Sequence, residues 1–183
     1  MSDLSQARVL ILATDGFEDS ELFEPRQALL DAGAKVTLAS IKTDPIQGVR
    51  HDSDPTRTIT PDLTLDQVDT EDFDALLLPG GVGNPDKLRM EDRAVSIVGE
   101  FMDDEKIVAA ICHAPWLLVE ADVVDGRRVT SWPSVRTDLE NAGADVADEE
   151  VVIDGNLITS RKPDDIPAFN RALIQALEDD LAG

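Results

Sequence analysis

The chain has 183 residues, with 38 Asp and Glu against 16 Lys and Arg, which gives a formal net charge of −22. This length is enough for a hydrophobic core, and we expect residues 1–183 to form one domain. The charge argues against a nucleic-acid partner, which needs clustered Lys and Arg, and no apolar stretch is long enough to predict a membrane span.

The first half of the chain alternates apolar runs with helical patterns. Continuous apolar runs are typical of strands buried on both faces, and they predict strands at Arg8–Thr14, Lys35–Ile41 and Ala75–Pro79. A helix is expected from Glu18 to Asp31 with Gly33 as its stop, and Pro25 predicts a kink or a late start within it. Residues 43–72 are polar and predict irregular structure, with short strand pieces around residues 57–59.

The second half continues the alternation and ends in a hairpin and a helix. A helix is expected from Pro85 to Met102, then a strand over Lys106–Ile111 that leads into Cys112. The later elements are a short strand at 129–131, a helix at 134–142, a hairpin of 151–153 with 157–159 around Asp154-Gly155-Asn156, and a closing helix at 164–181. The pattern predicts an α/β fold with a mostly parallel sheet, helices on both faces and a C-terminal hairpin.

Cys112 is the only cysteine, and it lies between a buried strand and a helix. Pro115 fits the first turn of that helix, where its missing N–H costs nothing. The open N–H groups of a helix start favour a thiolate, the reactive form of the side chain. The alternative is a buried structural cysteine, the usual fate of a lone one.

Three turns that contain candidate reactive or ligand-binding residues follow three apolar strands. Parallel strands place these turns on one edge of the sheet, where open α/β sheets bind ligands. Glu18 is the candidate acid beside Cys112, or else only an acid near a helix start. Gly80 and Gly81 offer backbone N–H groups for an oxyanion hole, or else form a plain tight turn.

His113 directly follows the candidate nucleophile and is one of two histidines. It is a candidate base, or it only shapes the turn. His51 lies in a polar stretch and is interpreted as a loop residue. Two separated histidines and one cysteine do not predict a metal site, and no cofactor is indicated.

These motifs resemble those of the ThiJ/PfpI superfamily, in particular its PfpI-type, peptidase C56-like branch. The resemblance covers nearly the whole chain and is carried by residues 15–21, 73–81, 110–115, 130–133, 141–144 and 151–161. It implies a flavodoxin-like three-layer sandwich of the class I glutamine amidotransferase-like type, with Cys112 at a strained elbow and Glu18 as its hydrogen-bonded partner. An amidotransferase itself is disfavoured, because no later histidine follows His113.

The resemblance also implies a homo-oligomer, a dimer or a hexamer, with the site near a subunit contact. The matching acid from a neighbouring subunit is Asp86, which would orient His113; alternatively, Asp86 is only an acid at a helix start. The chain has Asp where the archetypal protease has Glu, one extra residue before it, and Cys-His-Ala-Pro in place of the common Cys-His-Gly-Pro.

Three functions are compatible with the resemblance. The first is a cysteine-dependent, cofactor-independent glyoxalase or deglycase that acts on a small aldehyde or on a glycated protein or peptide. The second is an intracellular cysteine peptidase that uses the same nucleophile. The third is a non-enzymatic stress protein whose exposed thiol is oxidised as a redox sensor.

Composition also bears on the environment of the protein. Asp outnumbers Glu by 26 to 12 and Arg outnumbers Lys by 11 to 5, a balance that resembles halophilic proteins. Molar salt shortens the Debye length to roughly 3 Å and screens the repulsion, so we expect the Tm to be higher in multimolar salt than in dilute buffer. The first residues lack a secretion pattern and one cysteine cannot form an internal disulfide, so a cytoplasmic location is expected.

Overall fold

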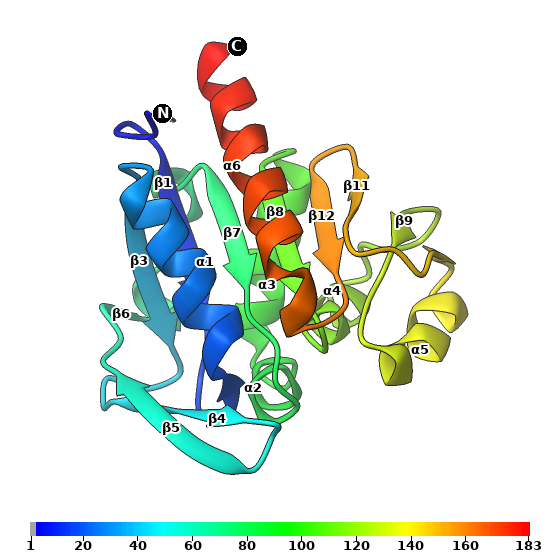
Figure 1. Cartoon of the computed structure of the whole chain (residues 1–183), viewed down its shortest axis with the longest axis horizontal. Helices are drawn as coiled ribbons and strands as arrows, with labels where there is room; N and C mark the ends of the chain where they lie inside the picture. Colours follow the sequence, from blue (N-terminus) through cyan, green and yellow to red (C-terminus); the bar gives the residue numbers. More distant parts are fainter. Residues whose placement is uncertain (1–2) are drawn as a thin grey trace.

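A seven-stranded sheet lies at the centre of the computed structural model, which describes residues 3–183 (Figure 1). The strand order is β11-β12-β8-β7-β1-β3-β6. The bounds are β1 Arg8–Leu12, β3 Lys35–Ser40, β6 Leu63–Thr64, β7 Ala75–Leu78, β8 Ile107–Ile111, β11 Val152–Asp154 and β12 Leu157–Ser160. Every neighbouring pair is parallel except β11 with β12, so the predicted mostly parallel sheet with a C-terminal hairpin is confirmed.

Helices cover both faces of this sheet. They are α1 Asp19–Asp31, α2 Gly83–Leu88, α3 Asp92–Asp103, α4 Pro115–Glu120, α5 Arg136–Asn141 and α6 Ile166–Ala182. In Figure 1, α1 and α6 lie in front of the sheet, and α3 and α4 lie behind it. The arrangement has three layers, as the sequence predicts.

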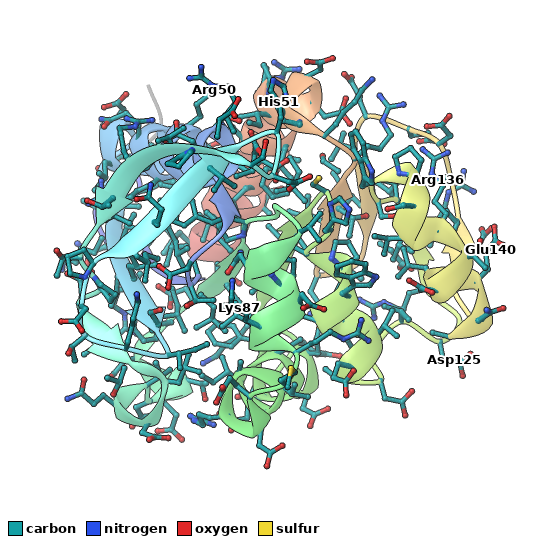
Figure 2. The ribbon with its side chains drawn as sticks, turned by 90° about the horizontal axis from the view of Figure 1, so that it is seen from below. Arg50, His51, Lys87, Asp125, Arg136 and Glu140 are labelled. Atoms are coloured by element: carbon teal, nitrogen blue, oxygen red, sulfur yellow. The ribbon has the colours of Figure 1, made fainter. Side chains whose placement is uncertain are left out.

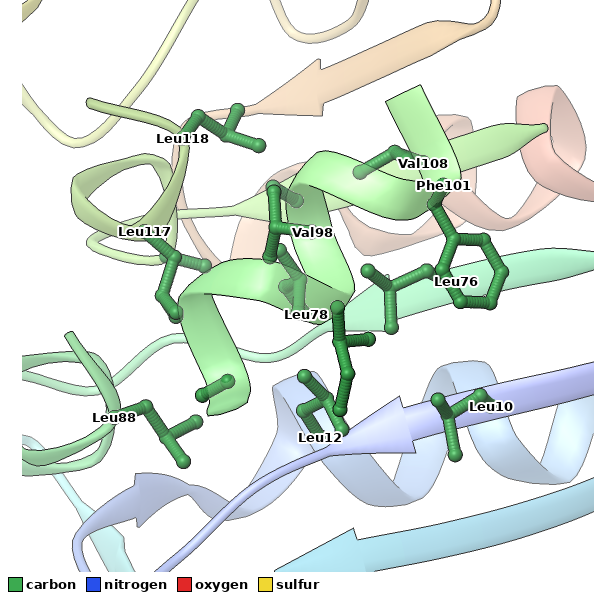
Figure 3. Packing of buried hydrophobic residues seen from close by; sticks show 14 of the residues in the cluster. Leu10, Leu12, Leu76, Leu78, Leu88, Val98, Phe101, Val108, Leu117 and Leu118 are labelled. Atoms are coloured by element: carbon green, nitrogen blue, oxygen red, sulfur yellow. The ribbon is translucent and has the colours of Figure 1, made fainter. Parts of the chain in front are cut away.

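Each central strand sends alternate side chains into two separate cores. Leu10 and Leu76 pack on the face covered by α3, where they meet Val98 and Phe101 (Figure 3). The intervening Ile11 faces the other core, which α1 and α6 cover. Burial on both faces explains why these strands are continuous apolar runs rather than alternating ones.

The predicted helix over 85–102 is wrong in one respect, because the structure has two helices there. The break falls at residues 89–91, and Glu91 is extended with φ −97° and ψ 110°. Leu88 and Ala94 are both fully buried in the same core. Six residues at about 100° each would place them on different sides of one continuous helix, so the break lets both point inward.

Residues 43–72 are more regular than the sequence predicts. They form an antiparallel ribbon of β4 (Ile46–Arg50) and β5 (Asp54–Ile59), which joins β2 (Phe17–Glu18) in a second small sheet. The ribbon escapes a pattern-based prediction because no residue of β5 is buried, and because Asp and Pro are poor strand formers. Two 3₁₀ turns follow, at Leu65–Gln67 and Thr70–Asp72.

The remaining elements lie close to their predicted positions. α1 begins at Asp19 with Pro25 buried inside it, so the late start is not observed. The short strand near 129 is β9 (Arg128–Val129), which pairs with β10 (Asp145–Val146) outside the main sheet. Short 3₁₀ turns at Pro133–Val135 and Pro163–Asp165 precede α5 and α6. Within residues 3–183, no helix has both the length and the apolar character that crossing a membrane requires.

Candidate active site

The elbow at Cys112 is held in a strained backbone conformation. Cys112 has φ +65°, a left-handed value that non-glycine residues seldom adopt. Its N–H donates to the Ser160 carbonyl at the end of β12 (3.0 Å), and its carbonyl accepts from the Trp132 N–H (2.9 Å). α4 begins three residues later with Pro115 in its first turn. The expected strand–corner–helix is thus present, and two other segments fix its geometry.

The carboxyl beside the thiol belongs to Glu21 in the first turn of α1, not to Glu18. Glu21 has no exposed surface, and a methyl group added at Gly80 would lie 2.5 Å from its Oε1 and 2.8 Å from the Cys112 Cβ. Within the described residues 3–183, neither Glu21 carboxylate oxygen has a hydrogen-bond partner. Burial of the side chain is the main cause, and the nearby charge of Glu18 the second, that raises the pKa of Glu21 to about 8. Contacts with Cys112, Gly80 and Gly81 lower the pKa, but by less.

The Cys112 thiol is coupled to this carboxyl. Burial, and then the charge of Glu21, raise the pKa of Cys112 well above its usual value, against the smaller effect of the His113 and Gly81 N–H groups. This differs from the thiolate that a helix start alone would favour. Two adjacent buried acids cannot both ionise cheaply, so the pair keeps a proton near pH 7.

Glu18 lies at the rim of the same cavity. It ends β2 just before α1, is 8% exposed, and its Oε1 accepts from the His51 N–H at 3.4 Å. Burial raises its pKa. Glu18 precedes α1, which begins at Asp19, whereas Glu21 lies within the helix on its buried side with Leu22. An acid on the buried stripe of a helix is the sequence signal that would have found Glu21.

His113 connects the thiol to a residue that the sequence analysis missed. Its Nδ1 lies 3.3 Å from Cys112 Sγ, and its Nε2 lies 3.3 Å from Ser134 Oγ. The ring stacks on Trp132, with centroids 5.9 Å apart and planes at 26°. Burial lowers the pKa of His113, so the imidazole is neutral near pH 7 and has one donor and one acceptor nitrogen.

The Gly80-Gly81 turn follows β7 and lies against the elbow. Gly81 has φ +80°, and a side chain there would collide with the Gly16 carbonyl. The buried Asn84 side chain donates to the Pro79 carbonyl (2.9 Å) and accepts from the Thr14 N–H (2.8 Å), which ties the turn to the end of β1. Both glycines are therefore needed for close approach, and Asn84 fixes where their N–H groups lie.

Asp86 is exposed on α2 and does not line the cavity around the thiol. Its expected contact with His113 of a neighbouring subunit stays a prediction. The acid of this chain that raises the pKa of His113 is Asp52. Asp52 and His51 form the tip of the β4–β5 ribbon, where Figure 2 labels His51. Both have left-handed backbones, with φ 64° and 52° respectively.

These residues surround a cavity of about 80 Å³, which we call the thiol cavity. Cys112 is 6% exposed but lines this cavity, so the sulfur is not sealed in the core. The full lining is Glu18, Glu21, His51, Asp52, Gly81, Cys112, His113, Trp132 and Pro163.

The fold and the elbow define an α/β protein with a cysteine site at the carboxyl edge of a parallel sheet. Residues 7–176 match the DJ-1/PfpI family, and the chain belongs to this family. It is 47% identical over 173 residues to general stress protein 18 of Bacillus subtilis, and the alignment covers 93% of this chain and 98% of that protein. A deglycase of Thermococcus kodakarensis is 43% identical over 170 residues, with 93% and 99% covered.

Two further similarities fit the same family. A putative cysteine protease of Bacillus subtilis is 39% identical over 171 residues, with 93% of this chain and 98% of that protein covered. Among solved structures, Drosophila melanogaster DJ-1beta superimposes with a TM-score of 0.85 at 31% identity, over 97% of this chain and 91% of that one. The names of the relatives thus include both a deglycase and a protease.

Proposed function

We propose that the protein is a DJ-1/PfpI-type deglycase or glyoxalase that uses Cys112 as its nucleophile on reactive aldehydes or their amine adducts. The observation that carries this proposal is the thiol itself, which lines a small cavity between a buried carboxyl and a neutral imidazole. Relatives named deglycases support the reaction class. A cavity of about 80 Å³ favours a substrate group of a few heavy atoms.

His113 is the group best placed to take the thiol proton. If its Nε2–H donates to Ser134 Oγ, then Nδ1 carries the lone pair and faces the sulfur 3.3 Å away. Ser134 is then a positioning residue that selects the useful tautomer. Glu21, protonated near pH 7, adds no second negative charge beside the thiolate that forms.

The first step is addition to a carbonyl. The Cys112 Sγ–carbon bond forms, the carbonyl π pair moves to oxygen, and that oxygen receives the proton that left the thiol, through His113 or Glu21. The product is a hemithioacetal. The N–H groups of Gly81 and His113 would stabilise the developing oxyanion, since the glycine turn brings the backbone close to the sulfur.

The test is turnover of methylglyoxal in multimolar salt by the wild-type protein and by Cys112→Ala. We expect activity that the substitution abolishes, with Cys112→Ser as a matched variant that keeps the size and polarity of the side chain. An unchanged rate in either variant would remove Cys112 from the reaction.

The peptidase is the second candidate, because one relative is a putative cysteine protease. The small volume of the thiol cavity favours a small substrate group over an extended peptide, but peptide hydrolysis that depends on Cys112 would reverse the order of the two candidates. A protein with neither activity, whose Cys112 is selectively oxidised by mild peroxide, would instead fit the sensor alternative.

A further inference from the structure

A second cavity of about 260 Å³ adjoins the thiol cavity and differs from it in charge. Trp132 lines both, and Lys162 of the second cavity is the chain neighbour of Pro163 in the first. The thiol cavity has no Lys or Arg in its lining, whereas three of the six lining residues of the second cavity are cations. We call this second cavity the arginine cavity; it is lined by Trp132, Pro133, Arg136, Asp148, Arg161 and Lys162.

Arg161 is fixed on the side away from the arginine cavity by the buried carboxylate of Asp165. Its Nε and Nη2 donate to the two carboxylate oxygens of Asp165 at 2.8 and 2.9 Å, and Asp165 is 3% exposed. The remaining Nη1 donates to Asp148 in the arginine cavity at 2.9 Å. Asp165 therefore serves as an anchor, and one edge of the guanidinium is left for an acceptor in the cavity.

Two guanidinium groups converge on a single oxygen. Asp148 Oδ1 accepts from Arg136 Nη2 at 2.8 Å as well as from Arg161. The Asp148 side chain is 64% exposed and lies in a segment without helix or strand, so water screens and competes with these pairs. The geometry thus already accommodates one carboxylate oxygen, supplied by a weakly held surface residue.

The cations of the arginine cavity have further hydrogen-bond donors that do not bind Asp148. Among residues 3–183, the buried Arg136 Nε has no hydrogen-bond partner. The Lys162 ammonium lies 3.9 Å from Asp164, beyond hydrogen-bond distance, and Asp164 is 86% exposed. In Figure 2, Arg136 lies at the start of α5, on the same upper side of the view as His51 at the ribbon tip.

We propose that the arginine cavity is a subsite for a carboxylate on the amine part of the substrate, such as the carboxylate of an adducted amino acid or a peptide C-terminus. This rests on the proposed function, in which an aldehyde-derived group enters the thiol cavity. The paired N–H donors of an arginine guanidinium fit the two oxygens of a carboxylate. A chain of charge −22 repels anions, so a singly charged carboxylate enters at less cost than a phosphate dianion.

The subsite makes opposite predictions for two substitutions. Asp148→Asn removes the negative charge of the internal competitor and lowers KM for a substrate with a carboxylate. Arg136→Gln removes a donor and raises it. Arg161 is not substituted, because its loss would leave the buried Asp165 carboxylate without its charged partner. Arg128→Gln is the matched control, since it removes the same charge from the exposed pair with Glu149 outside the cavity.

The substrates are a pair that differs in one group: the methylglyoxal adducts of Nα-acetyl-lysine and of Nα-acetyl-lysinamide. At fixed ionic strength we expect kcat/KM of the wild type to favour the carboxylate by roughly tenfold, about the effect of one charge-assisted hydrogen bond. Arg136→Gln should abolish the preference, Asp148→Asn should increase it, and Arg128→Gln should leave it unchanged. Equal values for both substrates in the wild type overturn the subsite.

A binding measurement separates this proposal from the proposed function. In Cys112→Ala/Trp116→Phe, Trp132 is the remaining tryptophan, and its fluorescence reports on both cavities. We expect Nα-acetyl-lysine to bind more tightly than its amide, with the difference lost on Arg136→Gln. Such binding without turnover of either adduct would refute the deglycase and keep the subsite, whereas equal binding of the two compounds refutes the subsite. A glycylglycyl-lysine arm shows whether a peptide C-terminus is accepted as well as a free amino acid.

Discussion

The elbow at Cys112 and the tip of the β4–β5 ribbon both contain left-handed residues, but their surroundings differ. Cys112 is 6% exposed, and backbone hydrogen bonds from β12 and from Trp132 fix it. The tip residues His51 and Asp52 are exposed, and each contributes one contact to the site, with Glu18 and with the Val82 N–H. The comparison suggests that the reacting atom is placed by the core, whereas the ribbon adjusts the electrostatics at the rim. Substitutions should therefore cost far more at the elbow than at the tip.

The largest effect is expected from Gly81→Ala beside the elbow. A side chain there requires an unfavourable φ and meets the Gly16 carbonyl, which is backbone and cannot rotate away. We expect the free energy of unfolding to fall by about 3 kcal/mol or more, with loss of activity. The matched control is Gly99→Ala in α3, where an added Cβ would meet no other part of residues 3–183 within 4 Å beyond the helix's own backbone, and a gain of about 0.5–1 kcal/mol is expected. Denaturant titration of both variants measures the free energy of unfolding. An equal decrease in the two variants would contradict this account.

The second prediction concerns the proton on Glu21. Its folded-state pKa of about 8 lies above the ordinary value of 4.5, so the folded state binds this proton more tightly than the unfolded state. Its stabilising contribution is fully present below about pH 4.5 and is lost as the pH rises through about 8. In Glu21→Gln we expect this loss, on the order of a few kcal/mol, to disappear from the pH dependence of the free energy of unfolding. The check is unfolding at pH 5 and pH 9; parallel curves for the wild type and the variant would show that the group does not titrate there.

The third prediction addresses the orientation of His113. Ser134→Ala removes the partner of Nε2, and we expect kcat to fall roughly five- to tenfold with little change in KM, the effect of one neutral hydrogen bond. The kcat–pH profile should change shape, because the tautomer is no longer selected. Ser134→Thr keeps the hydroxyl and should restore the wild-type profile. A profile that is the same in all three proteins would leave Ser134 without a role.

The smallest effect is expected at the ribbon tip. Asp52→Asn keeps an acceptor for the Val82 N–H but removes the charge that raises the pKa of His113. The pKa of His113 should fall, and the acid limb of the kcat/KM–pH profile should move to lower pH by a few tenths of a unit. Stability should change by less than about 0.5 kcal/mol. A loss comparable to that of Gly81→Ala would erase the distinction between the two regions.

Much of the site could be read from short segments of the sequence. The strand into Cys112, the helix with Pro115 and the glycine turn are local patterns, and parallel strands must bring their ends to one edge. The acid was harder to assign, because Glu18 and Glu21 lie on either side of a helix start. Both side chains line the thiol cavity, and only the packing of α1 against the elbow makes Glu21 the fully buried one.

Long-range partners were beyond reach for a different reason. Ser134 meets His113 from 21 residues away, through a 3₁₀ turn that no periodicity marks. Arg136, Asp148 and Arg161 converge from a helix, an irregular segment and the end of a strand. Such contacts depend on how the β9–β10 region packs beside the main sheet, and no local pattern specifies that packing.

The burial of Cys112 has a practical consequence for measuring the stability of this protein. A labelling reagent attached to a bulky carrier is larger than the substrate groups proposed for the thiol cavity, and it meets a sulfur that is 6% exposed and follows a central strand buried on both faces. Labelling should therefore wait for opening of the central sheet rather than fraying of a loop. The single thiol then serves as a built-in clock for native-state unfolding, without an engineered probe.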